Sequence, residues 1–478
     1  MKVVKWVVIL LILEFGLFIP KVSSQSYHAI NGSPYAGVSG IYVNPASSVN
    51  SVYKWNVNIL SLQAEASNSS FIANKFSLTN SDSSSSNITN GYKPRYFHSN
   101  LDISLLNISY KPNNKNAFSF GIRGRMFAHI KQAPYFYTDT IKSVTSFLNT
   151  NSTAQYLEAF AISSGWMEFN FNYARTLIQD KYSRLTGGIT LAYTKGLSGA
   201  YSNVDHITYQ EDATNNYYEI AGGRVTTELS STYDSLASNR SASSNIHRFL
   251  SHALSSFDLN IGFEYLFKNS FDGKDINEEN YDWKIGVSIM DIGKNRYAPS
   301  VSAFAASKPN VNADLSNLQT EINNVKELND LKKLTRDYFS SIDSITSAFK
   351  ITNPTRMIIN VDRNLGNHFY VNGELNINFY STEPWNGLHT REINLVTVTP
   401  RWETRNLGFY LPVQYNSQGQ LWVGAAAKLG PLLLGVNSLD FINWFKKHTQ
   451  DFNGGFYLML NIHPFKQKEF DGIECPRW

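Results

Sequence analysis

The chain contains little of what most soluble domains and helical membrane proteins are built from. Its 478 residues include one cysteine, Cys475, which excludes an intrachain disulfide and a zinc site made of cysteines. Charged residues make up 17%, and 42 basic against 38 acidic side chains leave a net charge of +4. This near balance excludes a nucleic-acid binder that works by bulk charge. Beyond the N-terminal segment, no stretch is apolar for the roughly 18 residues that suggest a membrane-spanning helix.

The N-terminus has the features of a secretory signal peptide. Lys2 and Lys5 supply a positive start, residues 6–19 are almost wholly apolar, and small residues follow at Ser23 and Ser24. We predict a signal peptide over residues 1–24, cleaved before Gln25, and therefore an exported protein. The alternative is an anchoring helix, but the apolar run of about 14 residues is shorter than the ~20 that span a bilayer.

Apolar and polar residues alternate along much of the remaining chain. The clearest segments are 118–125, 167–173, 257–267, 283–289 and 369–379. Successive side chains of a β-strand point to opposite faces, so each segment has one apolar and one polar face. A soluble β-sandwich would bury the apolar face, whereas a transmembrane barrel would turn it to lipid. The length of the runs favours the barrel, because membrane strands need about 9–11 residues and soluble strands average about 5–6.

The predicted fold class is therefore an all-β, transmembrane antiparallel β-barrel of about 14 strands, within residues 51–465. The strands are expected at 53–66, 99–110, 117–130, 164–176, 184–195, 255–267, 282–291, 355–363, 368–380, 393–402, 406–414, 419–428, 431–437 and 454–464. Two further strands at 205–229 would give about 16. The long links (67–98, 131–163, 196–254 and 292–354) fall on one side, as extracellular loops do.

Three segments between the strands carry patterns of their own. Residues 312–348 have apolar side chains at helical spacing, which predicts a helix packed on the barrel mouth or inserted as a gate. Residues 438–447 are typical of a short amphipathic helix at the outer interface. Asp272, Asp275, Glu278 and Glu279 predict a solvated acidic turn, with a calcium site as the alternative.

Charged side chains alternate with the apolar residues and are expected to face the lumen. The predicted lumen-facing residues are Arg123, Arg125, Glu168, Asp258, Glu264, Lys284, Asp362 and Glu374. Both signs occur, whereas an ion-selective pore tends to present rings of one sign. The set therefore indicates either a lumen whose charged side chains pair with one another or a lumen that forms a path for a substrate.

No residue pattern indicates catalysis. The chain lacks a Gly-x-Ser-x-Gly elbow, a His-Glu-x-x-His motif and a phosphate-binding loop, and its ten histidines are scattered. We therefore expect no enzyme, no cofactor and no bound metal.

The segment after the predicted cleavage site resembles a hatch. Asn44, Pro45 and Ala46 follow the glycines Gly32, Gly37 and Gly40, and this run is similar to the N-terminal hatch of FadL-like outer-membrane barrels. The resemblance implies that residues 25–50 plug the lumen, with the three glycines permitting tight turns.

Stretches over nearly the whole mature chain resemble an uncharacterised Bacteroidota family of outer-membrane barrels, DUF5723-like. The matching stretches are 40–55, 188–196, 286–293, 353–372, 397–403 and 422–435. The resemblance implies a Gram-negative outer-membrane location and no reaction. Residues 466–478 are expected to form a short periplasmic tail.

Two functions are compatible with these features. The first is passive transport or binding of a small hydrophobic ligand through a plugged barrel, with an apolar pocket among loops 131–163 and 292–354. The alternative is a scaffold or secretion-associated barrel that holds protein partners without transport. The expected partners are outer-membrane lipid and lipopolysaccharide, a small hydrophobic ligand, and a periplasmic or surface protein, with no nucleic acid.

Overall fold

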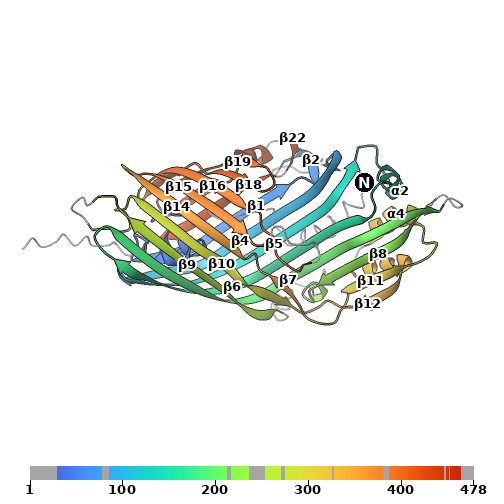
Figure 1. The fold of residues 1–478 in the computed structure, drawn as a ribbon, viewed down its shortest axis with the longest axis horizontal. Helices are drawn as coiled ribbons and strands as arrows, with labels where there is room; N and C mark the ends of the chain where they lie inside the picture. The colour runs from blue at the N-terminus through green and yellow to red at the C-terminus, as the bar shows by residue number, and fades with distance from the viewer. Residues whose placement is uncertain are drawn as a thin grey trace, which may run out of the picture.

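The wall of the molecule is a closed antiparallel β-barrel (Figure 1). The computed structural model describes residues 29–77, 85–212, 217–235, 253–270, 275–325, 328–380, 387–445, 448–451 and 453–464. Neighbouring wall strands pair in chain order, and β23 closes the circle by pairing with β1, so that Leu62 faces Leu458. Fourteen strands form the wall, as the sequence predicted. The predicted signal peptide and periplasmic tail lie outside the described residues.

The wall strands agree closely with the predicted positions at the end that carries the short turns. In order they are β1 (Trp55–Asn68), β4 (Gly91–Asn113), β5 (Asn116–Tyr137), β6 (Leu157–Gln179), β7 (Ser183–Asp212), β9 (Leu254–Phe267), β10 (Trp283–Tyr297), β14 (Arg356–Gly366), β15 (Phe369–Asn378), β16 (Leu395–Glu403), β17 (Leu407–Tyr410) with β18 (Val413–Asn416), β19 (Leu421–Val423) with β20 (Ala425–Leu429), β21 (Leu432–Val436) and β23 (Gly454–Ile462). Two wall strands are interrupted, one at Pro412, which has no N–H to donate, and one at Gly424.

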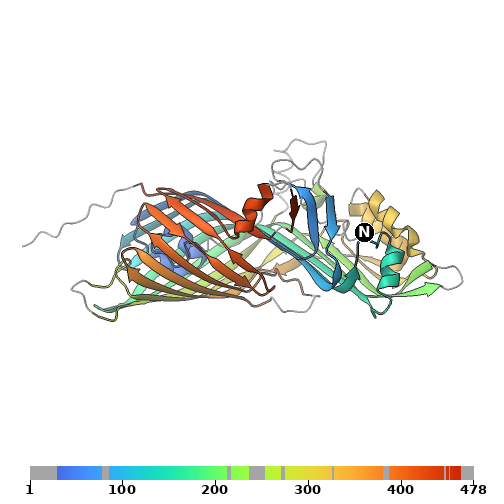
Figure 2. The ribbon, with the colours of Figure 1, turned by 90° about the horizontal axis from the view of Figure 1, so that it is seen from above.

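At the opposite, long-loop end, β4 to β7 continue far beyond the length that a membrane requires (Figures 1 and 2). Much of the predicted loops 67–98, 131–163 and 196–254 is therefore strand. We call this projecting part the extension. Its further elements are β8 (Tyr217–Leu229), β11 (Phe304–Pro309), β12 (Phe339–Ser344), α2 (Val144–Thr150), η4 (Leu315–Asn317), α4 (Leu318–Asn324) and α5 (Leu328–Tyr338). Residues 205–229 do form a hairpin, but it widens the extension and adds no strand to the wall.

The helical prediction for 312–348 is correct only to Tyr338, since β12 follows and pairs with β11. The helices pack on the extension sheet, where Leu315, Tyr338 and Phe339 are buried, and so they do not form a gate in the lumen. Among the described residues, no helix is long and apolar enough to cross a membrane.

The remaining elements are short. They are η1 (Gly37–Tyr42), η2 (Pro45–Ser48), η3 (Tyr233–Ser235), η5 (Leu439–Phe445), β13 (Phe349–Thr352), and a separate sheet of β2 (Phe71–Phe76), β3 (Ser85–Ile88) and β22 (His448–Gln450). η5 is the helix predicted at 438–447, and it leaves Leu439, Ile442 and Phe445 exposed.

The two faces of the wall have opposite chemistry. Phe257, Phe263, Phe369 and Phe409 all lie on the outer face and are 51–63% exposed. The polar residues between them are buried inside. A soluble sandwich would bury the phenylalanine rows against each other, so that alternative is wrong. A closed barrel with an apolar outer face is the form in which strands cross a bilayer with every backbone group paired.

Candidate functional site

The chain before the first wall strand lies inside the barrel, and we call residues 29–50 the plug. Asn44 caps η2 by accepting a hydrogen bond from Ala46 N at 3.0 Å, and Pro45 occupies the first helical position. The Asn44 side chain also donates to Phe263 O of the wall at 2.9 Å. The Asn-Pro-Ala motif thus builds one turn of the plug and joins it to β9.

Glycines allow the plug and the wall to approach closely. Gly32 and Gly37 have φ values of +72° and +60°, so both occupy the left-handed region that other residues disfavour. Gly40 lies within η1, where a side chain would meet Ser47. On the wall, a Cβ at Gly188 would overlap the backbone of Pro45.

Polar side chains of the wall bind the plug on several sides. Asn31 Nδ2 donates to Glu374 Oε2 at 2.8 Å, and Asn50 Nδ2 donates to Glu264 Oε2 at 2.7 Å. Lys284 Nζ donates to Gly32 O. Three of the predicted lumen-facing residues therefore form hydrogen bonds with the plug. Because these groups are buried, each bond is strong and its loss would leave a polar group unsatisfied.

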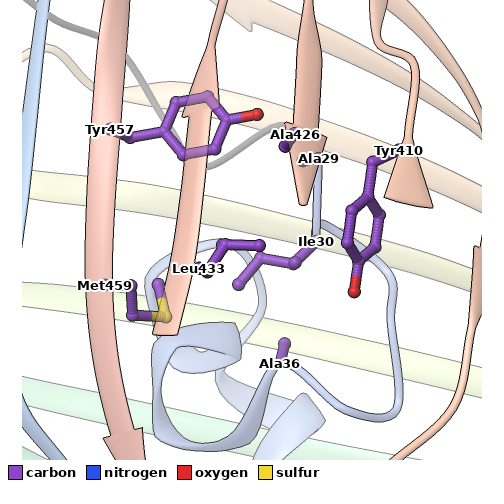
Figure 3. Packing of buried hydrophobic residues seen from close by; sticks show 8 residues of the cluster. All are labelled: Ala29, Ile30, Ala36, Tyr410, Ala426, Leu433, Tyr457 and Met459. Carbon is purple, nitrogen blue, oxygen red and sulfur yellow. The ribbon is translucent and has the colours of Figure 1, made fainter. Parts of the chain in front are cut away.

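An apolar contact holds the plug on one side (Figure 3). The buried residues of this contact are Ala29, Ile30 and Ala36 of the plug and Tyr410, Ala426, Leu433, Tyr457 and Met459 of the wall. The plug is therefore fixed by polar contacts on most sides and by a small apolar patch against the strands β17 to β23.

An ion-pair cluster lies on the short-turn side of the plug. Arg401 donates to both carboxylate oxygens of Asp362, at 2.6 and 2.9 Å, and through Nε to Glu403 at 2.6 Å. All three side chains are fully buried. Glu403 also accepts a hydrogen bond from Ser33 Oγ at 2.7 Å, so the cluster is connected to the plug.

A second ion-pair cluster lies on the long-loop side of the plug. Arg125 donates to Asp291 at 2.6 Å and to Glu168 at 3.2 Å, and Arg123 pairs with Asp102. Asp291 also pairs with Arg356 at 3.2 Å, which in turn contacts Glu392 at 2.6 Å. Charges of both signs are thus paired within this cluster, and the plug contacts it where the ring of Tyr42 lies under Arg123.

The eight predicted lumen-facing residues all lie inside the wall and are buried. Four belong to the two ion-pair clusters, three bind the plug, and Asp258 accepts a hydrogen bond from Asn353 Nδ2 at 2.6 Å. Sequence reasoning missed Arg401 and Glu403, although their alternation with Val398 and Trp402 would have placed them inside. Asp291 could not have been found in this way, because a β-bulge turns it inward against the alternation of β10.

The described part of the acidic turn is only partly solvated, since Asp275 and Glu279 are exposed while Glu278 is paired with cations of the wall instead of a metal ion. Lys111 Nζ lies 2.5 Å from Glu278 Oε1, and Arg184 Nη1 lies 3.3 Å from the same oxygen. Glu279 accepts a hydrogen bond from Tyr35 of the plug at 2.9 Å. Burial alone would raise the pKa of Glu278, but the two cations outweigh it and hold the pKa below its usual value. Asp272 lies outside the described residues. Residues 275–281 therefore form a floor turn that joins the wall to the plug.

An apolar cavity of about 340 Å³ lies between the extension sheet and the helices α2, α4 and α5. Its lining includes Phe147, Leu157, Ile207, Leu334 and Phe339. These residues come from the two loop regions in which an apolar pocket was predicted and from a third segment, β7 with β8. The cavity lies at the long-loop end, beyond the plug and the second ion-pair cluster.

The sequence matches a protein family described as "Family of unknown function (DUF5723)" over residues 45–437. The chain belongs to the DUF5723 family. This confirms the family resemblance of the sequence motifs, while the predicted Bacteroidota origin stays a prediction. No curated protein matched this DUF5723 chain.

Three solved structures illustrate the folds to which this chain is similar. The Ralstonia pickettii toluene transporter TbuX is 10% identical, with a TM-score of 0.41 over 91% of this chain and 99% of that one. A Pseudomonas aeruginosa FadL homologue is 9% identical, with a TM-score of 0.41 over 92% and 99%. The P. putida toluene transporter TodX is 8% identical, with a TM-score of 0.40 over 92% and 95%. These values are too low for a ligand to be transferred to this DUF5723 protein.

Proposed function

We propose that this protein is an outer-membrane barrel that binds a small hydrophobic molecule in the cavity of the extension and passes it inward passively past the plug. The apolar cavity is the observation that carries the proposal. Its volume of about 340 Å³ is at the lower end of the range of ligand sites, roughly 300–1,000 Å³. With the ~30 Å³ that one water occupies as a guide, it has room for on the order of ten non-hydrogen atoms.

In this proposal the long-loop end faces the outside and the short-turn end faces the periplasm. The extension captures the ligand from water, because transfer of apolar surface out of water supplies the binding free energy. The plug and the two ion-pair clusters fill the lumen below the cavity, so passage requires the plug to move. The predicted signal peptide would deliver the chain to the outer membrane.

Ligand binding is tested by filling the cavity. Val204 lines the cavity, whereas Val301 is 80% exposed. We expect Val204→Phe to lower the affinity for the apolar fluorophore naphthalene, whose carbon skeleton matches the volume of the cavity, at least about tenfold, because the added ring takes up the space of the ligand. Val301→Phe is the matched control and should bind as the wild type does. Equal binding by both variants, or no binding by the wild type, would overturn the proposal.

The transport step is tested separately by fixing the plug. Ser48 Oγ donates to Asn172 Oδ1 at 2.8 Å, so cysteines at these two positions are in reach of each other. In a chain with Cys475→Ser, we expect oxidation of Ser48→Cys/Asn172→Cys to stop uptake of radiolabelled naphthalene by cells, and reduction to restore it. Fluorophore binding to the cavity should not change.

The alternative is a scaffold that holds protein partners and transports nothing. The filled lumen favours it, since residues of the wall bind the plug on several sides. Uptake that is equal in the locked, unlocked and deletion strains would support this alternative. The absence of enzymatic activity stays a prediction.

A further inference from the structure

Three metal-binding side chains converge on the outer surface of the extension. Glu158 comes from β6, and Asp205 and His206 come from the neighbouring strand β7. His206 Nδ1 lies 3.2 Å from Glu158 Oε1 and 2.7 Å from Asp205 Oδ1. All three ligand atoms lie within 4.8 Å of one another. The cluster therefore offers one imidazole nitrogen and two carboxylates at a single point.

A β-bulge brings these side chains together. Leu157 faces Ile207 and Ala159 faces Val204 in the β6–β7 pairing, so Asp205 and His206 together oppose Glu158. In a regular strand two consecutive side chains would point to opposite faces. The bulge instead keeps Val204 and Ile207 at the cavity and leaves the pair between them on the outer side.

The bulge gives His206 an unusual backbone conformation. Its φ is +49°, in the left-handed region that a non-glycine residue rarely adopts. The ring of Tyr156 lies against His206, with 4.4 Å between the ring centres, and holds the imidazole beside the carboxylates.

We propose that Glu158, Asp205 and His206 bind a divalent transition-metal cation of the zinc class. A tetrahedral zinc site with bonds of about 2.0–2.1 Å places its ligand atoms roughly 3.3 Å apart. The 3.2 Å between His206 Nδ1 and Glu158 Oε1 is close to this spacing, while Asp205 Oδ1, at 2.7 Å from the same nitrogen, has to move away from it. The imidazole selects zinc over calcium and magnesium, which prefer oxygen ligands. Three protein ligands leave a fourth position for water or for a partner's side chain.

The site lies directly behind the rim of the apolar cavity. Leu157, Val204 and Ile207 line the cavity and neighbour the three ligands in the chain. A bound cation would therefore join β6 to the bulge of β7 and brace this side of the cavity. The proposal does not depend on the proposed hydrophobic ligand, because cation binding is measured without one.

Zinc binding is tested by isothermal titration of the full, untagged protein in detergent micelles. We expect one zinc per chain, which a large excess of calcium does not displace. His206→Ala and Glu158→Gln should each weaken binding at least about tenfold. His368→Ala is the matched control, because His368 is also exposed and has a left-handed φ of +67°, and it should bind zinc as the wild type does.

X-ray absorption at the zinc edge provides a readout that does not depend on the variants. The expected spectrum of the wild type shows a four-coordinate cation with one imidazole among nitrogen and oxygen ligands. The absence of stoichiometric binding, a spectrum without imidazole, or equal affinity in the His206→Ala variant with an unchanged circular dichroism spectrum would overturn the proposal.

Discussion

Arg401 shows how single residues determine the interior of this barrel. Its guanidinium lies between Asp362 and Glu403 and uses three of its nitrogens to satisfy both carboxylates. All three side chains are withdrawn from water, so each charge depends on its partner. A buried pair of this kind adds little stability compared with apolar residues, but removal of one partner is costly. The cluster therefore joins β14 to β16 and, through Glu403 and Ser33, to the plug.

We predict that Arg401→Gln lowers the free energy of unfolding by about 3–5 kcal/mol, because two buried carboxylates lose their cation. Arg363→Gln on β14 is the control. Arg363 is 31% exposed and lies 3.9 Å from Asp282, so its replacement should cost less than about 1 kcal/mol. Urea unfolding in lipid vesicles measures both values. Similar losses for the two variants would contradict the role assigned to Arg401.

The floor turn 275–281 shows how one element joins the plug to the wall. Ile276 and Tyr281 are buried against Leu266 and Tyr370, and Glu278 binds Lys111 of β4. The turn is longer than the other links at its end of the barrel because it covers the barrel end as well as connecting two strands.

The floor turn should be sensitive to acid. The pKa of Glu278 is held lower in the folded protein than in the unfolded chain, where it is about 4.3. The ion pairs of Glu278 with Lys111 and Arg184 therefore contribute their full stabilisation above about pH 4.3, and this stabilisation is lost as the pH falls through the folded pKa. We expect Glu278→Gln to lower the hydrogen-exchange protection of residues 275–281 roughly 30-fold at pH 7, equivalent to about 2 kcal/mol.

Asp275→Asn is the control for the floor turn, because Asp275 is exposed. Its protection factors should match those of the wild type at every pH. The wild type should lose protection in the floor turn as the pH falls through the folded pKa of Glu278, and the Glu278→Gln variant should not show this loss. If that loss persists, another group is responsible for it.

At the scale of the whole molecule, the wall separates lipid from a filled polar interior. Phe263 is 51% exposed on the outer face of β9, while Glu264, the next residue, is buried and binds the plug. The same strand thus meets hydrocarbon on one side and the amides of the plug on the other. The extension lies beyond this wall, and its outer residues meet water.

This division predicts that one substitution has a large effect on the wall and almost none on the extension. Phe263→Lys should lower the free energy of unfolding in lipid vesicles by about 2–4 kcal/mol, because a charge that faces hydrocarbon loses its hydration. Tyr92→Lys should change it by less than about 0.5 kcal/mol, because Tyr92 is 70% exposed on the extension. If Phe263→Lys left the free energy of unfolding unchanged, this face of β9 would not contact hydrocarbon.

The sequence alone determined the wall and the chemistry of its two faces. Alternation is a local property, since each side chain points to the face opposite its neighbour's, and so the 14 strands and the burial of residues such as Arg125 and Asp362 could be read from it. The expectation of a plug came instead from the resemblance of the Asn-Pro-Ala motif to a FadL-like hatch, and the capping of η2 by Asn44 accounts only for the local turn.

Only the tertiary structure decided which residues pair inside the barrel and where the alternation of inward and outward side chains is interrupted. Ion pairs such as Arg125 with Asp291 join residues far apart in the chain, and their choice depends on how the strands tilt and close. Bulges turn Asp291 inward and set Asp205 beside His206, and one inserted residue reverses the face of every residue after it. The cavity and the floor turn exist because distant segments fill the two ends of a barrel, which no local pattern records.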